Sequence, residues 1–533
     1  MKAAGTESPL VRPAGIDAGA EAHRASESVG AYRQILKSSA LIGASSLFNI
    51  FFGIIRTKAM ALLLGPSSFG LMGAYGSIVD LSRTLAQMGV NASGVRQIAQ
   101  SAATGDDTRT AATSQTLKRV AFATASLGAL ALLASSKYVA QFTFGSTSQW
   151  GDIALLSLAV FFGVLAGGQT ALIQGMRRIA DLSQLAMIGT FLGTIASIAL
   201  VYFLRENGLA LSLIVGAAIS ALAGWWYSRR IALPRVTASF GGSANEAAEF
   251  FKLGAAFMAG DLLTQGAAYI VRIIILRDSG LAAAGLYQAA WTLGGLYVGF
   301  VLQAMATDFY PRLAATIQDK DEANLLVNQQ ASVSMLLAGP GVVGTLTFAP
   351  IVVHLLYSAR FDGASEILRW VCFGMALKAI TWPMGFIVAA SGRQMILLAA
   401  ELAWTVVNVL LTWVCVARMG PVGAGFAFFA SYIFHAVMLY PLVRHLTGFR
   451  WTTSNLQLGM VYVVSCSVVI AASYALAPGL ATVIGIVVCS LLTLQGALRL
   501  AQMSAAGPLP SPVLKLMKYT RWIRHPIRGD GVV

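Results

Sequence analysis

Long apolar stretches recur along almost the whole chain and constrain its fold more than any other feature. We count 14 of them between about residue 36 and about residue 499 of the 533 residues. About 18 consecutive apolar residues are enough for a helix to cross the hydrocarbon core of a bilayer. Charged residues make up only 11% of the chain, whereas a soluble domain has about 25%. The sequence therefore predicts an all-α integral membrane protein with about 14 transmembrane helices.

The expected helices are joined by short connections. Their predicted spans are 36–63, 69–91, 117–138, 152–174, 182–204, 208–228, 250–276, 282–306, 329–356, 365–390, 394–417, 420–443, 456–477 and 479–499. No P-loop, HExxH, GxSxG or CxxC motif is present, and the histidines, including His354 and His435, lack the spacing of metal ligands. The four cysteines are scattered in apolar runs. We therefore expect a protein that is not an enzyme, without cofactor, metal or disulfide.

The placement of basic residues predicts the orientation in the membrane. The net charge is +15. Connections on one side carry most of the cations, namely Arg96, Arg109, Lys118, Arg119, Arg177, Arg178, Arg229, Arg230, Arg312 and Arg393. Those on the other side hold little more than Lys137, Arg205, Arg277, Arg360 and Arg418. This positive-inside asymmetry places both termini in the cytoplasm. Because topology accounts for the basic excess, we expect no nucleic-acid partner.

Arginines recur at a fixed spacing, which indicates an internal repeat. Three pairs are separated by 216 residues each: Arg56 and Arg272, Arg96 and Arg312, and Arg177 and Arg393. In the same regions FGLMGAYGS (69–77) resembles AGLYQAAWT (284–292) with a shift of one residue. The repeat predicts two homologous six-helix bundles of the same orientation, related by an axis along the membrane normal. Such an arrangement favours a transporter that holds its substrate between the bundles.

The repeat and the composition together divide the chain into six parts. They are a disordered cytoplasmic tail at 1–35, the first bundle at 36–230, a cytoplasmic linker at 231–249, the second bundle at 250–445, two further helices at 456–499, and a basic cytoplasmic tail at 500–533. Because one duplicated chain supplies both bundles, we expect a monomer.

Polar side chains inside the predicted helices must be kept away from lipid. On the first helix Asn49 and Arg56 fall on one polar face, whereas Lys58 points elsewhere and is expected to reach the membrane interface. An ionisable side chain deep in lipid costs at least about 2.5–3.5 kcal/mol. A water-filled cavity between the bundles would shelter such residues. The alternative is structural ion pairing, for which Asp80 and Arg83 have the right spacing.

Candidate binding residues come from both predicted bundles. Arg56 and Arg272, as members of one repeat pair, would clamp a diphosphate, because guanidinium pairs bidentately with phosphate. Pairing of Arg272 with Asp261 is the alternative for that arginine. The carboxylates Asp80, Asp261 and Glu401 are candidates for coupling to H⁺ or Na⁺. Since no ATP motif is present, transport would depend on ion gradients, the substrate gradient or the membrane potential.

Residues 37–100 resemble the opening of the Wzx-type O-antigen flippases. The resemblance is carried mainly by IIRTKAMALLLGPSSFGLMG (54–73) and GVRQIAQ (94–100). These flippases belong to the multidrug/oligosaccharidyl-lipid/polysaccharide (MOP) exporter superfamily. The resemblance implies a MATE-like fold of two lobes with a central cavity that opens alternately to either side. In the rest of the chain the similarity rests on helix count and duplication.

The resemblance also implies a function. The cargo would be an oligosaccharide on undecaprenyl pyrophosphate, moved across the bacterial inner membrane for O-antigen or exopolysaccharide synthesis. A cationic cavity would bind the sugar pyrophosphate, which favours Arg56, Arg83, Arg272 and Lys378 as anion contacts, with Asn49 beside Arg56. Ion coupling would drive the transport.

Three alternatives stay open at this point. A cation-coupled drug antiporter of the same superfamily would need a cavity dominated by acidic groups. A membrane enzyme such as a polymerase or ligase would need a large outer loop, and the outer connections here are short. A channel or scaffold is the third alternative.

Overall fold

The computed structural model describes residues 17–234 and 240–506, whose regular secondary structure is helical throughout. Ten helices are long and apolar enough to cross a membrane, and one further bent pair passes the same test together. Gly43–Gln87, Ile179–Ser228 and Phe257–Ala306 are 45 to 50 residues long. At about 1.5 Å per residue, each is roughly twice as long as a hydrocarbon core of about 30 Å. With these three counted twice and the bent pair once, the described residues hold the expected 14 crossings.

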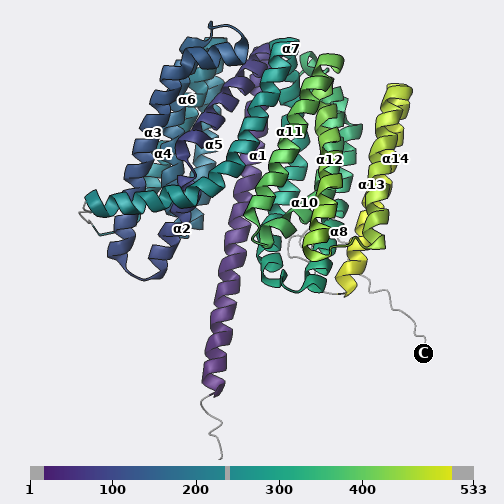
Figure 1. Ribbon diagram of the computed structural model, residues 1–533. Helices are drawn as coiled ribbons and strands as arrows, with labels where there is room; N and C mark the ends of the chain where they lie inside the picture. The colour runs from purple at the N-terminus through teal and green to yellow at the C-terminus, as the bar shows by residue number, and fades with distance from the viewer. Residues whose placement is uncertain (1–16, 235–239, 507–533) are drawn as a thin grey trace, which may run out of the picture.

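The helices form two groups that stand side by side (Figure 1). The first group, here the N-terminal lobe, contains α1 (Asp17–Gln87), α2 (Val90–Ala103), α3 (Asp107–Phe144), α4 (Trp150–Gly175), α5 (Ile179–Leu204), η1 (Arg205–Asn207) and α6 (Gly208–Ser228). The second group, the C-terminal lobe, contains α7 (Phe240–Thr316), α8 (Lys320–Thr347), α9 (Ala349–Leu356), η2 (Ala359–Phe361), α10 (Ala364–Ala390), α11 (Gln394–Met419) and α12 (Val422–Thr447). Helices α13 (Thr453–Ala475) and α14 (Pro478–Ala506) lie at the far edge of this lobe.

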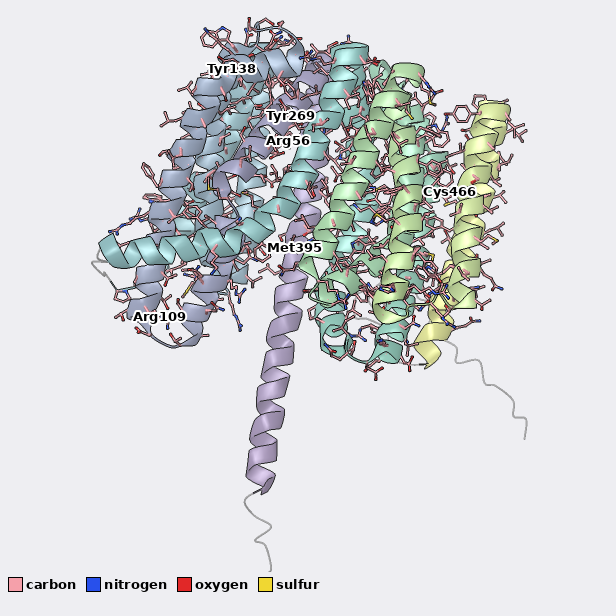
Figure 2. All side chains as sticks on the ribbon, viewed as in Figure 1. Arg56, Arg109, Tyr138, Tyr269, Met395 and Cys466 are labelled. Carbon is pink, nitrogen blue, oxygen red and sulfur yellow. The ribbon has the colours of Figure 1, made fainter. Side chains whose placement is uncertain are left out.

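Helices α1 and α7 each break at a glycine near the same end of the bundle. Gly65 has φ 77° and ψ −179°, and Gly280 has φ 86° and ψ 177°. Positive φ is readily accessible only to glycine, so these residues let each long helix divide into two crossings. Arg205 at the α5–α6 turn donates to the carbonyl of Leu63, beside the first break. We call this end of the bundle the Gly65 end, and the opposite end, where Arg109 lies in Figure 2, the Arg109 end.

Equivalent backbone features of the two lobes lie 215 residues apart. Besides the two breaks, the matching pairs are Arg177 (φ 54°) with Gly392 (φ 70°), the N-caps Arg178 (φ −82°, ψ 66°) and Arg393 (φ −87°, ψ 64°), and the C-caps Arg205 (φ 54°, ψ −129°) and Gly420 (φ 61°, ψ −151°). The spacing of 216 between the arginine pairs is thus one residue too long for this structure. Arg56 precedes its break by nine residues and Arg272 by eight. A shift of one residue turns a side chain by about 100° around a helix, so Arg56 and Arg272 are not structural equivalents.

Helices α3 and α8 begin with the same cap at the Arg109 end. The carboxylate of Asp106 accepts hydrogen bonds from the backbone N–H groups of Thr108 (2.9 Å) and Arg109 (3.1 Å). Asp319 accepts in the same way from the two residues that follow Lys320, at 3.0 and 3.1 Å. Such caps satisfy amide groups that have no partner within the helix. The Thr108 hydroxyl also donates to Asp106, and these bonds hold the pKa of the Asp106 carboxyl below its usual value.

Two helical segments differ from expectation near the membrane surface. The span expected at 329–356 is two helices, α8 and α9, bent by 77° at Phe348. Pro350 in the first turn of α9 explains the break, because proline has no N–H and clashes with the preceding turn. The connection expected between the second and third crossings contains α2, which is 14 residues long and, at about 21 Å, too short to cross.

Three expected connecting or terminal parts are helical where the structure describes them. Helix α1 begins at Asp17, so residues 17–35 are helical and not a disordered tail. Their alanines, glutamates and arginines favour a helix. Helix α7 begins at Phe240 inside the expected linker 231–249, and Phe250 is fully buried against α2, α3 and α4. Helix α14 extends to Ala506, while the rest of the basic tail, residues 507–533, and residues 1–16 lie outside the described residues.

Candidate functional site

The two lobes meet at the Gly65 end through a pair of glycines. A Cβ atom on Gly70 would lie 2.1 Å from the carbonyl oxygen of Leu281, and one on Gly285 would lie 1.9 Å from that of Pro66. Neither position therefore has room for a side chain, and the backbones of α1 and α7 are in direct contact. Gly285 follows Gly70 by 215 residues, which makes the two glycines structural equivalents. Their contact therefore lies where the two halves of the repeat meet.

Side chains around the glycine pair also join the lobes. Lys58 of α1 donates to the carbonyl of Leu355 at 2.5 Å, near the C-terminus of α9, where a cation is favoured. The ring of Phe69 packs edge-on against Tyr357 and Phe361, each at 5.6 Å between centroids. In this structure the Gly65 end is the end at which these contacts hold the lobes together. Lys58 thus uses its length to reach the opposite lobe.

Arg272 of α7 lies just inside this closure and is held by a neutral side chain. Its Nε and Nη2 donate to Oε1 of Gln288 at 3.0 and 2.8 Å. Gln288 in turn lies against Gly73 of the N-terminal lobe, where a Cβ would be 3.0 Å from Oε1. Gly73 and Gln288 each follow the glycine contact by three residues, about one helical turn. Arg272 is therefore at the interface between the lobes, and its direct side-chain partner leaves its positive charge uncancelled.

The carboxylate proposed to pair with Arg272 lies elsewhere. Asp261 is exposed and precedes Arg272 by 11 residues, about 16 Å along a helix. Among the described residues Asp261 forms no ion pair. Asp261 therefore does not neutralise Arg272 in this structure.

Asp80 and Arg83 form the ion pair that their spacing predicts. Nη2 of Arg83 lies 3.3 Å from Oδ1 of Asp80, and both side chains are nearly half exposed, at 42% and 49%. Arg83 packs against Gly163 of α4. Asp80 also attracts Arg272 across the lobe interface. This carboxylate is thus shared between one arginine of each lobe.

Arg56 and Asn49 lie on α1 but apart from this group. Arg56 is exposed, lies in the half of the bundle toward the Gly65 end (Figure 2), and has no hydrogen-bond partner among the described residues. Asn49 is half-buried, and its Oδ1 is buried without a partner. Since Arg56 is also one residue out of register with Arg272, the structure does not place the two as a symmetric clamp.

Lys378 and Glu401 belong to a separate polar group inside the C-terminal lobe. They attract each other between α10 and α11, beyond ion-pair distance. Lys378 also acts electrostatically on His435 of α12. The ring of Trp404 lies 5.4 Å from Tyr432 and 6.2 Å from His435. Nε1 of Trp404 and Nδ1 of His435 are buried without a partner.

Sequence reasoning missed several residues of both groups. Gln288, Gly70, Gly73 and Gly285 were not singled out, although the shifted match of 69–77 with 284–292 contains all of them. His435 was set aside for want of ligand spacing. Its i, i+3 spacing from Tyr432 on one helix, mirrored by Glu401 and Trp404 on another, would have indicated a shared polar face.

The pairing of Lys378 with Glu401 can be tested by stability. Lys378→Met or Glu401→Gln leaves one charge unbalanced in the lobe interior, and each should lower the free energy of unfolding by about 1–3 kcal/mol. The double variant should lose less than the sum of the two. Thermal unfolding in detergent measures this, with Lys320→Met at an exposed helix start as the control. Strictly additive losses would exclude structural pairing.

A cavity elsewhere in the molecule contains none of the candidate residues. It has a volume of about 340 Å³ and lies between α8, α10 and α13. Its lining is mostly apolar and includes Met335, Ile380 and Val463. Its chemistry does not match that of the charged groups described above.

Comparison with known proteins relates the chain to glycan transport. Residues 59–366 match a family described as polysaccharide biosynthesis protein. A lipid III flippase of Escherichia coli is 22% identical over 402 residues, covering 75% of this chain and 95% of the relative. A probable low-salt glycan biosynthesis flippase of Haloferax volcanii is 22% identical over 156 residues, which is 29% of this chain and 33% of the relative.

Solved structures show the fold. The lipid II flippase MurJ in an inward closed conformation matches with a TM-score of 0.63 at 15% identity, covering 87% of this chain and all of that chain. A multidrug resistance MATE transporter in an inward-facing conformation matches with a TM-score of 0.57 at 15% identity, covering 76% and 94%. The expected MATE-like fold of a multi-pass membrane protein is thereby confirmed.

Proposed function

The chain belongs to the polysaccharide biosynthesis protein family, and from that premise we propose that it is a flippase for a lipid-linked oligosaccharide. Its cargo would be an oligosaccharide on undecaprenyl pyrophosphate, carried across the bacterial inner membrane for O-antigen or exopolysaccharide synthesis. Both flippase relatives named above, from a bacterium and an archaeon, support this class of cargo. Both termini would lie in the cytoplasm, which makes the Gly65 end the outer end.

The charge at the lobe interface is the observation that carries the proposal. Arg272 is held by the neutral Gln288, and Asp80 is the one carboxylate that serves both Arg83 and Arg272. Two guanidinium groups thus share a single carboxylate, so the group is net positive. A positive interface favours an anionic cargo such as a diphosphate. It disfavours a cation-coupled drug antiporter, which would need acidic groups to dominate.

Transport would follow alternating access between the lobes. The contact of Gly70 with Gly285 and the bond from Lys58 to Leu355 would hold the outer end shut while the cargo enters from the cytoplasm. The diphosphate would replace Asp80 as the counter-charge of Arg272. Asp80, Asp261 and Glu401 are the candidates for coupling to H⁺ or Na⁺, and a monomer would suffice.

Proteoliposomes test the function directly. The purified protein should increase the translocation of a labelled undecaprenyl-pyrophosphate oligosaccharide at least about tenfold over protein-free liposomes, measured by the label's access to a membrane-impermeant reagent. The uncharged undecaprenol is the control and should not be accelerated, because it offers no anion to the arginines. Efflux of organic cations without movement of the lipid-linked sugar would refute the proposal in favour of the antiporter.

A further inference from the structure

The N-terminal lobe carries a basic and aromatic surface at its Arg109 end. It is formed by Arg177 in the turn between α4 and α5 and by Trp225, Trp226, Arg229 and Arg230 at the end of α6, and we call it the α6 patch. All five residues are exposed, with Trp225 at 48% and Trp226 at 54%. No part of the proposed transport mechanism uses them.

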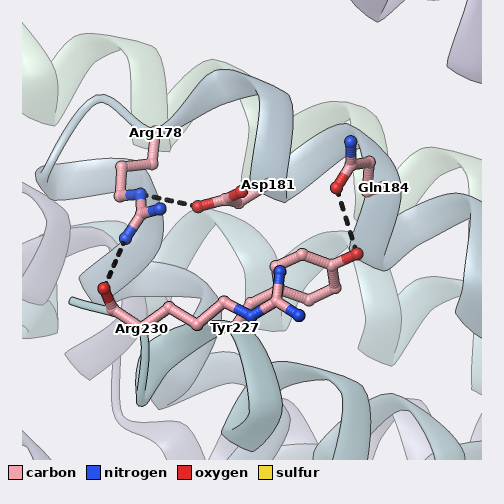
Figure 3. Close-up of polar contacts among 5 residues, drawn as sticks. All are labelled: Arg178, Asp181, Gln184, Tyr227 and Arg230. Atoms are coloured by element: carbon pink, nitrogen blue, oxygen red, sulfur yellow. Dashed lines mark hydrogen bonds and ion pairs between the residues drawn. The ribbon is translucent and has the colours of Figure 1, made fainter.

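A polar network fixes the backbone beneath the α6 patch (Figure 3). Arg178 is bound to Asp181 at 2.6 Å through Nε and donates from Nη1 to the carbonyl of Arg230 at 3.1 Å. The Tyr227 hydroxyl donates to Oε1 of Gln184 on α5 at 3.1 Å. These contacts join the α4–α5 turn to the end of α6. The patch is therefore a built surface and not a set of independent side chains.

The arginines of the α6 patch are stacked on aromatic rings. The guanidinium carbon of Arg229 lies 4.3 Å from the ring centroid of Trp225, and that of Arg230 lies 5.2 Å from those of Trp226 and Tyr227. Figure 3 shows the Arg230 guanidinium over the Tyr227 ring. A stacked guanidinium keeps the N–H groups in its own plane free to donate. Stacking therefore holds these arginines ready for an anion.

The positive charge of the α6 patch is not neutralised within the protein. Asp181 is engaged by Arg178. Arg177, Arg229 and Arg230 form no ion pair with any described residue. Three uncompensated cations on one small surface favour a ligand that carries negative charge.

The location of the patch indicates where that ligand comes from. Helix α6 packs mainly against α4 and α5 and, among the described residues, has no comparable packing with the C-terminal lobe. Trp225 and Trp226 lie in the last turn of a membrane span that ends at Ser228. Exposed tryptophans at the end of a span mark the level of the lipid headgroups. The patch thus faces the surrounding bilayer and not the interface between the lobes.

We propose that the α6 patch binds the phosphate headgroup of an anionic phospholipid in the leaflet at the Arg109 end. Arg229 and Arg230 donate to the phosphate from their stacked positions, and Trp225 and Trp226 pack against the glycerol region. Arg177 adds a third cation at the edge of the site. Basic clusters beside membrane helices bind anionic headgroups in this way.

Binding to brominated lipids tests the proposal. Brominated phosphatidylglycerol is titrated into the full-length protein in a zwitterionic detergent, and the quenching of tryptophan fluorescence gives the affinity. The double variant Arg229→Gln with Arg230→Gln should bind about 25-fold more weakly, since each cation near a membrane surface is worth about fivefold. The control replaces Arg444 and Arg450 by glutamine, two exposed arginines at the Arg109 end with no aromatic stacking partner among the described residues, and should bind like wild type. Each variant is first checked for a single symmetric peak in size-exclusion chromatography.

Three results would overturn the proposal. The first is equal affinity of wild type and the Arg229/Arg230 variant for phosphatidylglycerol. The second is equal affinity of wild type for brominated phosphatidylcholine, which carries no net charge. The third is displacement of the lipid by millimolar glycerol phosphate, which would identify a soluble phosphate as the ligand. None of these measurements depends on transport.

Discussion

Gly285→Ala is expected to abolish transport while the protein remains folded. The added methyl group would lie 1.9 Å from the carbonyl oxygen of Pro66, closer than any atoms can approach without a shift of the two helices. Overpacking of this kind costs about 1–3 kcal/mol, which changes the ratio of closed to open states at the Gly65 end by about 5- to 150-fold. Alanine is also the better helix former, so a loss of helix propensity would not explain the defect.

The effect on the closure can be measured separately from transport. Ala284, next to Gly285, is 5% exposed, and a cysteine placed there should be shielded in the closed state. In the Gly285→Ala background its labelling by a maleimide should be about tenfold faster, because the lobes part at this end. Labelling is compared with the parent protein, whose native cysteines are buried or half-buried.

Two other glycines provide matched controls for the closure. A Cβ on Gly299 in α7, or on Gly76 in α1, would meet no atom within 4 Å. Alanine at either position should therefore leave transport near the wild-type rate. Gly70→Ala should behave like Gly285→Ala, since its methyl would lie 2.1 Å from the carbonyl of Leu281. Normal transport by both Gly70→Ala and Gly285→Ala would show that the close contact is not needed for the cycle.

Gln288→Glu is expected to lower transport at least about tenfold without destabilising the protein. Gln288 accepts two hydrogen bonds from Arg272, and glutamate has the same shape and accepts the same bonds. The new carboxylate would cancel the charge of Arg272 and compete with a phosphate. A charge-assisted hydrogen bond is worth about 1.5–3 kcal/mol, so losing the contact with cargo corresponds to about 10- to 150-fold in rate.

Variants of Arg272 separate a structural role from a binding role. Arg272→Gln removes the charge and should reduce the translocation rate by the same factor of at least about ten. Arg272→Lys should retain part of the rate, because lysine keeps the charge but cannot bind phosphate bidentately. If Arg272 served structure alone, Gln288→Glu would strengthen its contact and transport would persist. Normal transport by Gln288→Glu would therefore refute the role of Arg272 as an anion contact.

Arg56→Gln is the informative comparison for the diphosphate clamp. Arg56 is one residue out of register with Arg272 and has no partner among the described residues. If its loss of transport equalled that of Arg272→Gln, both arginines would contact the cargo despite their different positions. A smaller loss would leave Arg272 as the main contact.

Much of the fold follows from the sequence because membrane crossing is a local property. The 14 apolar segments predict the 14 crossings, since the length of an apolar run decides whether it spans lipid. Asp80 and Arg83 pair as their spacing on one helix predicts. Proline explains the break before α9 and could have been recognised from the sequence. In each case the residues that interact lie within a few positions of one another.

What only the tertiary structure decided is which polar groups of different helices meet. Arg272 pairs with Gln288 and not Asp261, Lys58 reaches Leu355, and Gly70 meets Gly285. The repeat spacing of 215 in place of 216 separates Arg56 from Arg272 by a turn of about 100°. These outcomes depend on the rotation and close approach of helices far apart in the chain. The sequence by itself determined the number and length of the crossings, whereas packing between the lobes determined which charges share their interface.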